Sequence, residues 1–174
     1  MPLTAVTTED IAVVSKQLGR QARDIVAIAA RCTCGKPTVV QTAPRLGDGT
    51  PFPTTYYLTH PAATAALSTL EASGFMAELQ TKLSEDALLA DAYLKAHEAY
   101  IADRAQLEQA TGEVPEVAGI SAGGMPNRVK CLHALVGHAL AAGPGINPIG
   151  DQALALCSWS PERCVCSVET DVTN

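Results

Sequence analysis

Six cysteines and four histidines carry the most specific chemistry in this chain of 174 residues. Cys32 and Cys34 stand one residue apart in a short segment containing glycine and proline, and Cys164 and Cys166 repeat that spacing near the C-terminus. Two cysteines at this spacing in a tight turn can direct both sulfurs toward one centre, so two such pairs can supply four ligands to a tetrahedral metal ion. In the alternative interpretation, each cysteine is a small apolar side chain in its own environment.

A further cysteine, Cys131, precedes His133 and His138 in a segment whose apolar spacing predicts one helix over residues 126–142. At about 100° per residue, Cys131 and His133 would lie on opposite faces of that helix, and Cys131 and His138 would be about 10 Å apart along its axis. Neither pair therefore forms a two-ligand site alone. We expect Cys131 to be a metal ligand or a reactive thiolate with partners from distant loops, and His138 to be a packed residue.

A glycine-containing loop lies just before the predicted helix. Gly123 and Gly124 belong to this loop, and Arg128 and Lys130 lie in the expected first turns of the helix. Free backbone N–H groups at a helix start, flanked by two cations, can bind a phosphate or a carboxylate. The spacing matches neither a Walker loop nor a dinucleotide fingerprint. Arg45, in the Pro- and Gly-rich segment 44–53, is a further candidate anion contact; helix capping by the glycines and a solvated Arg45 are the alternatives.

His97 is a third candidate for acid or base chemistry, beside Cys131 and His133. It shares a predicted helix face with Tyr93, Tyr100 and Arg104, from which an imidazole can turn into a cleft. The alternative is an imidazole that packs against its neighbours or faces solvent. We therefore take Cys131, His133 and His97 as the candidate catalytic residues if the protein is an enzyme.

The elements that must position these residues follow from periodicity and from turn residues. Short runs rich in Ile, Val and Thr predict strands over residues 24–30, 38–41 and 55–58. Helical spacing predicts helices over residues 11–18, 59–73, 75–83, 84–107, 126–142 and 149–156. The sequence therefore predicts a single α+β domain over residues 1–174, in which a small N-terminal sheet packs against four or five helices.

Composition limits the classes of function. The chain is 47% hydrophobic, enough for one core, and it has neither a long apolar run nor the pattern of a signal peptide at its start. We therefore expect a cytoplasmic protein that does not enter membranes. In a reducing compartment disulfides explain the six cysteines poorly, with oxidation of an exposed pair as the alternative. The net charge of -6 argues against general nucleic-acid binding.

Several ordered strings resemble the bacterial family of unknown function 501 (DUF501), common in actinobacteria. These strings are Arg31-Cys32, Pro51-Phe52-Pro53-Thr54, Tyr57-Leu58-Thr59-His60-Pro61, Leu70-Glu71-Ala72, Val129-Lys130-Cys131-Leu132-His133 and Asn147-Pro148-Ile149-Gly150. The resemblance spans about residues 12–156 and leaves residues 157–174 as a C-terminal tail that contains cysteines.

The resemblance also implies a set of metal ligands. A cysteine often stands in the family where this chain has His60, and another recurs near Cys164 or Cys166; both residue types bind zinc. The implied set is Cys32, His60, Cys131 and Cys164, with Cys34, His133 and Cys166 as competitors. A histidine ligand favours zinc over an iron–sulfur cluster. The resemblance implies no reaction.

Two functions follow from these observations. In the first, which we prefer, a closed Cys/His metal site ties distant loops together in a structural or regulatory protein that has a protein partner. In the second, a metal- or thiolate-dependent enzyme acts on a small anionic, phosphorylated substrate held by the glycine loop, Arg128 and Lys130. Four protein ligands would indicate the first function, and three ligands with an open position the second.

Overall fold

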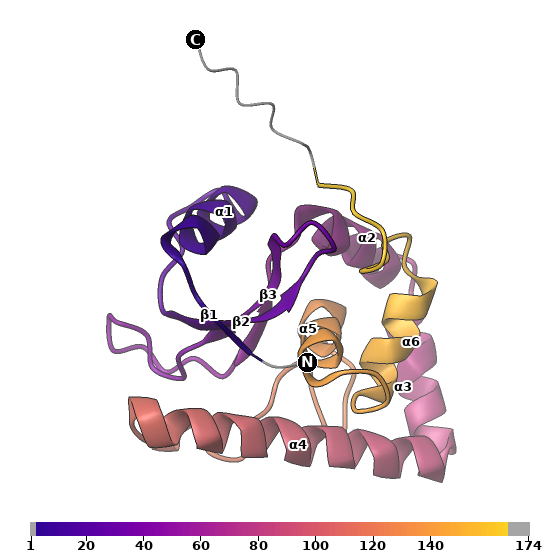
Figure 1. Cartoon of the computed structure of the whole chain (residues 1–174). Coiled ribbons are helices and arrows are strands. Elements are labelled where there is room, and N and C mark those ends of the chain that lie inside the picture. The colour runs from indigo at the N-terminus through magenta and orange to yellow at the C-terminus, as the bar shows by residue number, and fades with distance from the viewer. Residues whose placement is uncertain (1–2, 167–174) are drawn as a thin grey trace.

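The computed structural model describes residues 3–166, which form a four-stranded sheet and six α-helices (Figure 1). The strands are β1 (Thr4–Ala5), β2 (Ile25–Arg31), β3 (Pro37–Thr42) and β4 (Tyr56–Leu58). They lie in the order β1-β2-β3-β4, and each is antiparallel to the next. The predicted strands near residues 24–30, 38–41 and 55–58 are therefore present, whereas the sequence patterns did not predict the two-residue β1.

Both faces of the sheet are covered by helices. Val40 packs with Val14 of α1 (Thr8–Leu18) in one apolar cluster, and the adjacent Val39 belongs to the main core on the other face. Helix α5 (Leu132–Ala142) fills that second face, as Figure 1 shows. Because successive side chains of a strand point to opposite faces, a strand buried on both sides reads as a continuous apolar run. The α+β class is confirmed.

The remaining helices surround α5. They are α2 (Pro61–Ala72), α3 (Phe75–Glu85), the 25-residue α4 (Ala87–Thr111) and α6 (Pro148–Leu156), with a short 3-10 helix at Pro115–Val117. In Figure 1, α4 runs along the base of the molecule beneath α5. Between residues 3 and 166, no helix has both the length and the apolar character needed to cross a membrane.

Two helices begin slightly later than the ranges predicted from the sequence. Helix α2 begins at Pro61 rather than at residue 59, and His60 caps it: its Nδ1 accepts a hydrogen bond from the Ala63 N–H at 3.4 Å. Helix α4 begins at Ala87 rather than at residue 84, and Asp86 caps it by accepting from the N–H groups of the two residues that follow Ala87. Local sequence patterns do not resolve helix ends to the residue.

The prediction of a helix from residue 126 is wrong, because α5 begins only at Leu132. The N–H groups of Arg128 and Lys130 donate to the carbonyls of Gly124 and Gly123 at 2.9 and 2.8 Å, and the Val129 N–H donates to the Gln80 side chain. These hydrogen bonds fold the segment back on the glycine loop. Arg128 and Lys130 therefore do not lie in the first turns of a helix.

Candidate metal centre

The first cysteine pair lies in the hairpin that joins β2 to β3. The Cys32 N–H donates to the Lys36 carbonyl at 2.8 Å, and the Gly35 N–H donates to the Cys32 carbonyl at 2.8 Å. Gly35 has a φ of 87°, a left-handed conformation in which glycine is favoured. The turn is closed by its own backbone, so Cys32 and Cys34 are presented from a rigid hairpin, the first buried and the second exposed.

The second pair follows α6 in the C-terminal segment. Trp159 is 5% exposed and belongs to the main core, and its ring lies 5.3 Å from the His60 ring. The Arg163 N–H then donates to the Ser160 carbonyl at 3.3 Å, which turns the chain back toward the sheet. Trp159 therefore anchors the segment that carries Cys164 and Cys166 to the core beside His60.

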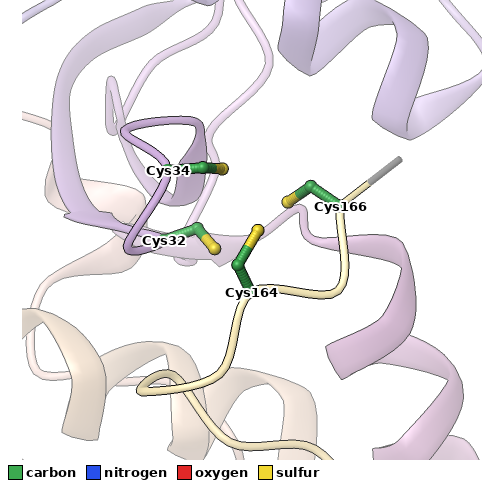
Figure 2. Close-up of side chains that lie close together, drawn as sticks. All are labelled: Cys32, Cys34, Cys164 and Cys166. Carbon is green, nitrogen blue, oxygen red and sulfur yellow. The ribbon is translucent and has the colours of Figure 1, made fainter. Parts of the chain in front are cut away.

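All four sulfurs meet between the hairpin and the C-terminal segment. The Sγ atoms of Cys32, Cys34, Cys164 and Cys166 all lie within 4.8 Å of one another. Figure 2 shows the four side chains pointing into the same space, two from each segment. Sulfurs bound at about 2.3 Å to one tetrahedral ion lie about 3.8 Å apart, so this spacing suits a single ion. We call these residues the four-cysteine centre.

Electrostatics favour a cation among these four sulfurs. Burial and the neighbouring sulfurs of Cys34 and Cys32 raise the pKa of Cys166 to about 12. Burial also opposes ionisation of Cys32, but hydrogen bonds from the Cys34 backbone and from neighbouring thiols lower its pKa to about 7. One thiolate is thus stabilised at the expense of its neighbours. A bound cation would offset this repulsion and allow all four sulfurs to ionise.

His60 lies beside the four-cysteine centre and is not a member of it. Its Nε2 is 3.2 Å from the Cys166 Sγ, and the residue is 2% exposed. Because Nδ1 accepts from the Ala63 N–H, the ring proton is on Nε2, which donates to the sulfur. Burial lowers the pKa of His60, so the ring is neutral. A hydrogen bond of this kind orients a thiolate ligand from outside the coordination sphere.

Cys131 belongs to a different group, with His133 and Glu71. One ligand atom from each of these three residues lies within 4.8 Å of the others. The expectation that Cys131 and His133 point in opposite directions is wrong. Cys131 has an extended backbone with φ of -155° and ψ of 109°, so helical angles do not apply, and its Sγ lies 4.0 Å from the His133 Nδ1. Of the predicted metal set, the structure brings Cys32 and Cys164 together and places Cys131 elsewhere.

The residues of the predicted anion site make contacts within the protein. A side chain at Gly124 would lie 2.6 Å from the Arg128 carbonyl oxygen, so Gly123 and Gly124 serve close packing against the segment that follows. Arg45 donates to both Glu116 carboxylate oxygens, at 2.8 and 2.7 Å, and to the Gly49 carbonyl. Anion binding by these residues stays a prediction.

The other two histidines, His97 and His138, contact a loop and the core respectively. His97 Nδ1 lies 2.8 Å from the Ser121 hydroxyl, in the loop before the two glycines. His138 is fully buried and stacks on Tyr56, and burial lowers its pKa to about 4. His138 is a packed residue, and a catalytic role for His97 stays a prediction.

One family model matches residues 28–155, and its description is protein of unknown function (DUF501). The chain belongs to the DUF501 family. The match contains the first cysteine pair, Glu71, Cys131 and His133, and it ends before Cys164 and Cys166. Neither a curated protein nor a solved structure matches this chain. Membership in DUF501 assigns no reaction, so function must be argued from the sites.

Proposed function

We propose that this DUF501 protein binds one zinc ion at the four-cysteine centre and that the ion ties the C-terminal segment to the β2–β3 hairpin. The observation that carries the proposal is the convergence of four sulfurs within 4.8 Å from two segments far apart in the sequence. Four protein ligands leave no open position on a tetrahedral ion, which is typical of a structural site.

Zinc suits this donor set better than the other metals. Thiolates favour zinc and iron–sulfur clusters over magnesium or calcium, which prefer oxygen ligands. An iron–sulfur cluster places several metal atoms among its cysteines and so needs a wider separation than one ion does. A reducing compartment, such as the expected cytoplasmic location, would keep the cysteines available to a metal.

The bound ion links the β2–β3 hairpin and the C-terminal segment into one continuous surface. Cys34 and Cys164 are exposed, so the ion lies near the surface rather than in the core. With the ion bound, both segments hold fixed positions and form one face that a protein partner can recognise. A structural or regulatory role is therefore the function that this geometry supports best.

Metal analysis of the full chain, purified without an affinity tag, tests the proposal. We expect one zinc per chain, no visible absorption band, and loss of the metal in Cys34→Ser and Cys166→Ser. Cys157→Ser is the matched control, since Cys157 lies outside the centre and donates to the Trp159 carbonyl at 3.2 Å. Wild-type protein that contains no metal when purified in this way, or cluster variants that both keep the metal, would contradict the proposal.

A further inference from the structure

A second cluster of reactive side chains lies between α2 and the start of α5. His133 Nε2 is 3.1 Å from the Thr64 carbonyl oxygen, and His133 Nδ1 is 3.1 Å from Glu71 Oε1. Thr64 and Glu71 are seven residues apart on α2, and the Thr64 carbonyl and the Glu71 side chain both reach the His133 ring. Glu71 Oε1 also accepts from the Leu132 N–H at 2.6 Å, which joins the carboxylate to the first turn of α5.

These contacts define the protonation state of His133. A carbonyl oxygen only accepts, so the Thr64 contact requires a proton on Nε2. A carboxylate also only accepts, so the Glu71 contact requires a proton on Nδ1 as well. The ring that satisfies both partners is the imidazolium. The hydrogen bond with Cys131, the contact to Thr64 and the charge of Glu71 together raise the pKa of His133 to about 9, although burial opposes this.

Cys131 lies where its thiolate can pair with the His133 imidazolium. Its Sγ lies 4.0 Å from His133 Nδ1, and Cys131 is the N-cap residue of α5, an 11-residue helix. Hydrogen bonding to His133 lowers the pKa of the Cys131 thiol, and the Ala134 backbone N–H lowers it further, against burial and the charge of Glu71. A helix N-terminus and an adjacent imidazolium are the two features that activate cysteine nucleophiles.

We propose that Cys131 is a nucleophilic thiolate, paired with His133 and positioned by Glu71, that accepts an acyl group from an uncharged ester or thioester. Cys131 is half-buried rather than enclosed in the core. The thiolate and Glu71 carry two negative charges against one positive charge on His133. This balance disfavours phosphorylated or other anionic substrates at this site and favours uncharged ones.

The acyl transfer balances with groups already present. The Cys131 thiolate adds to the carbonyl carbon, and the tetrahedral adduct collapses by breaking the bond to the leaving oxygen or sulfur. His133 gives its Nδ1 proton to that leaving group, which departs as an alcohol or thiol. Water then adds to the thioester as neutral His133 takes its proton. Breaking the C–S bond releases the carboxylic acid and restores the thiolate and imidazolium.

Residue-resolved alkylation measures the thiolate directly in the folded, full-length protein. We expect iodoacetamide at pH 7 to modify Cys131 at least about tenfold faster than Cys157, because only the thiolate reacts. Cys157 is the internal control: it is also half-buried, but its thiol donates to the carbonyls of Leu154 and Trp159. We also expect iodoacetamide to be favoured over the anionic iodoacetate more strongly at Cys131 than at Cys157.

His133→Gln tests the pairing with little change in shape, since the glutamine amide can still donate to Thr64 while the Nδ1 proton is lost. Alkylation of Cys131 at pH 7 should fall at least about fivefold, because the thiolate fraction falls. An unchanged rate in His133→Gln, or a Cys131 that reacts no faster than Cys157 in the wild-type protein, would overturn the proposal.

Acylation with p-nitrophenyl acetate completes the test. We expect a burst of one equivalent of nitrophenolate per chain followed by slower turnover, and an acetyl group on the peptide containing Cys131 when the reaction is quenched after the burst, both absent in Cys131→Ser. Metal chelation is the decisive control. If Cys131 becomes reactive only after a chelator removes a bound ion, then Cys131, His133 and Glu71 are metal ligands and the nucleophile proposal fails. The result is independent of whether the four-cysteine centre holds zinc.

Discussion

Removal of zinc from the four-cysteine centre should destabilise the protein and loosen its C-terminal segment. Cys34 and Cys164 are separated by 130 positions in the sequence, so an ion that joins them closes a long loop. A cross-link of that length removes about 17 cal/mol/K of entropy from the unfolded chain, or about 5 kcal/mol at 25 °C. If unfolding releases the ion instead, binding stabilises the folded state by about 4 kcal/mol when the free metal concentration is a thousand times Kd.

Either value is a large part of the 5–15 kcal/mol that stabilises a typical domain. For a chain of this length, each kcal/mol lost from the free energy of unfolding lowers Tm by about 2–4 °C. Chelation should therefore lower Tm by about 10–20 °C. Urea unfolding of the zinc-loaded and chelated proteins measures the difference in free energy. Cys164→Ser should match the chelated wild-type protein and should not respond to added zinc.

Trp159 reports on the segment itself, because it is the single tryptophan of the chain and lies between α6 and the cysteine pair. Its own burial stabilises the docked segment by about 2–3 kcal/mol, so chelation should expose it in part. We expect a red shift of its emission and stronger quenching by acrylamide. If chelation removes the ion but changes neither the unfolding midpoint nor the Trp159 emission, the ion does not hold the segment and our reasoning is wrong.

Three further predictions concern other contacts. His60→Asn should keep the cap of α2 but lose the donor to Cys166, lowering zinc affinity about 10- to 100-fold in a competition with a chelator. The Arg31 guanidinium lowers the pKa of Asp10 to about 2, so Asp10 contributes up to about 2 kcal/mol of stability above pH 4 that is lost as the pH falls toward 2. The difference between wild type and Asp10→Asn in urea midpoint should therefore be large at pH 7 and small at pH 2. Arg104 is 2% exposed and donates to the carbonyls of Val117 and Pro53. We therefore expect Arg104→Ala to lower the free energy of unfolding, measured by thermal denaturation, by about 3 kcal/mol. A decrease below about 1 kcal/mol would contradict that role.

The sequence alone determined the local features of this protein. Runs of Ile and Val define β2 and β3, and apolar spacing defines α2, α3 and α4, because strand and helix periods are properties of short segments. The two pairs of cysteines one residue apart are also visible in the sequence, and they are the features that meet in the four-cysteine centre. The DUF501 resemblance, carried by short strings, is likewise a property of the sequence and was confirmed.

Tertiary structure decided how these features combine. Helix α5 begins at Leu132 because carbonyls of Gly123 and Gly124 and the distant Gln80 bind the N–H groups that a longer helix would use. That start places Cys131 at a cap, where its sulfur approaches His133, and Glu71 completes the cluster from another helix. Sequence reasoning missed Glu71, because its spacing on α2 resembles that of any surface carboxylate. Long-range contacts set each site, and no local pattern encodes them.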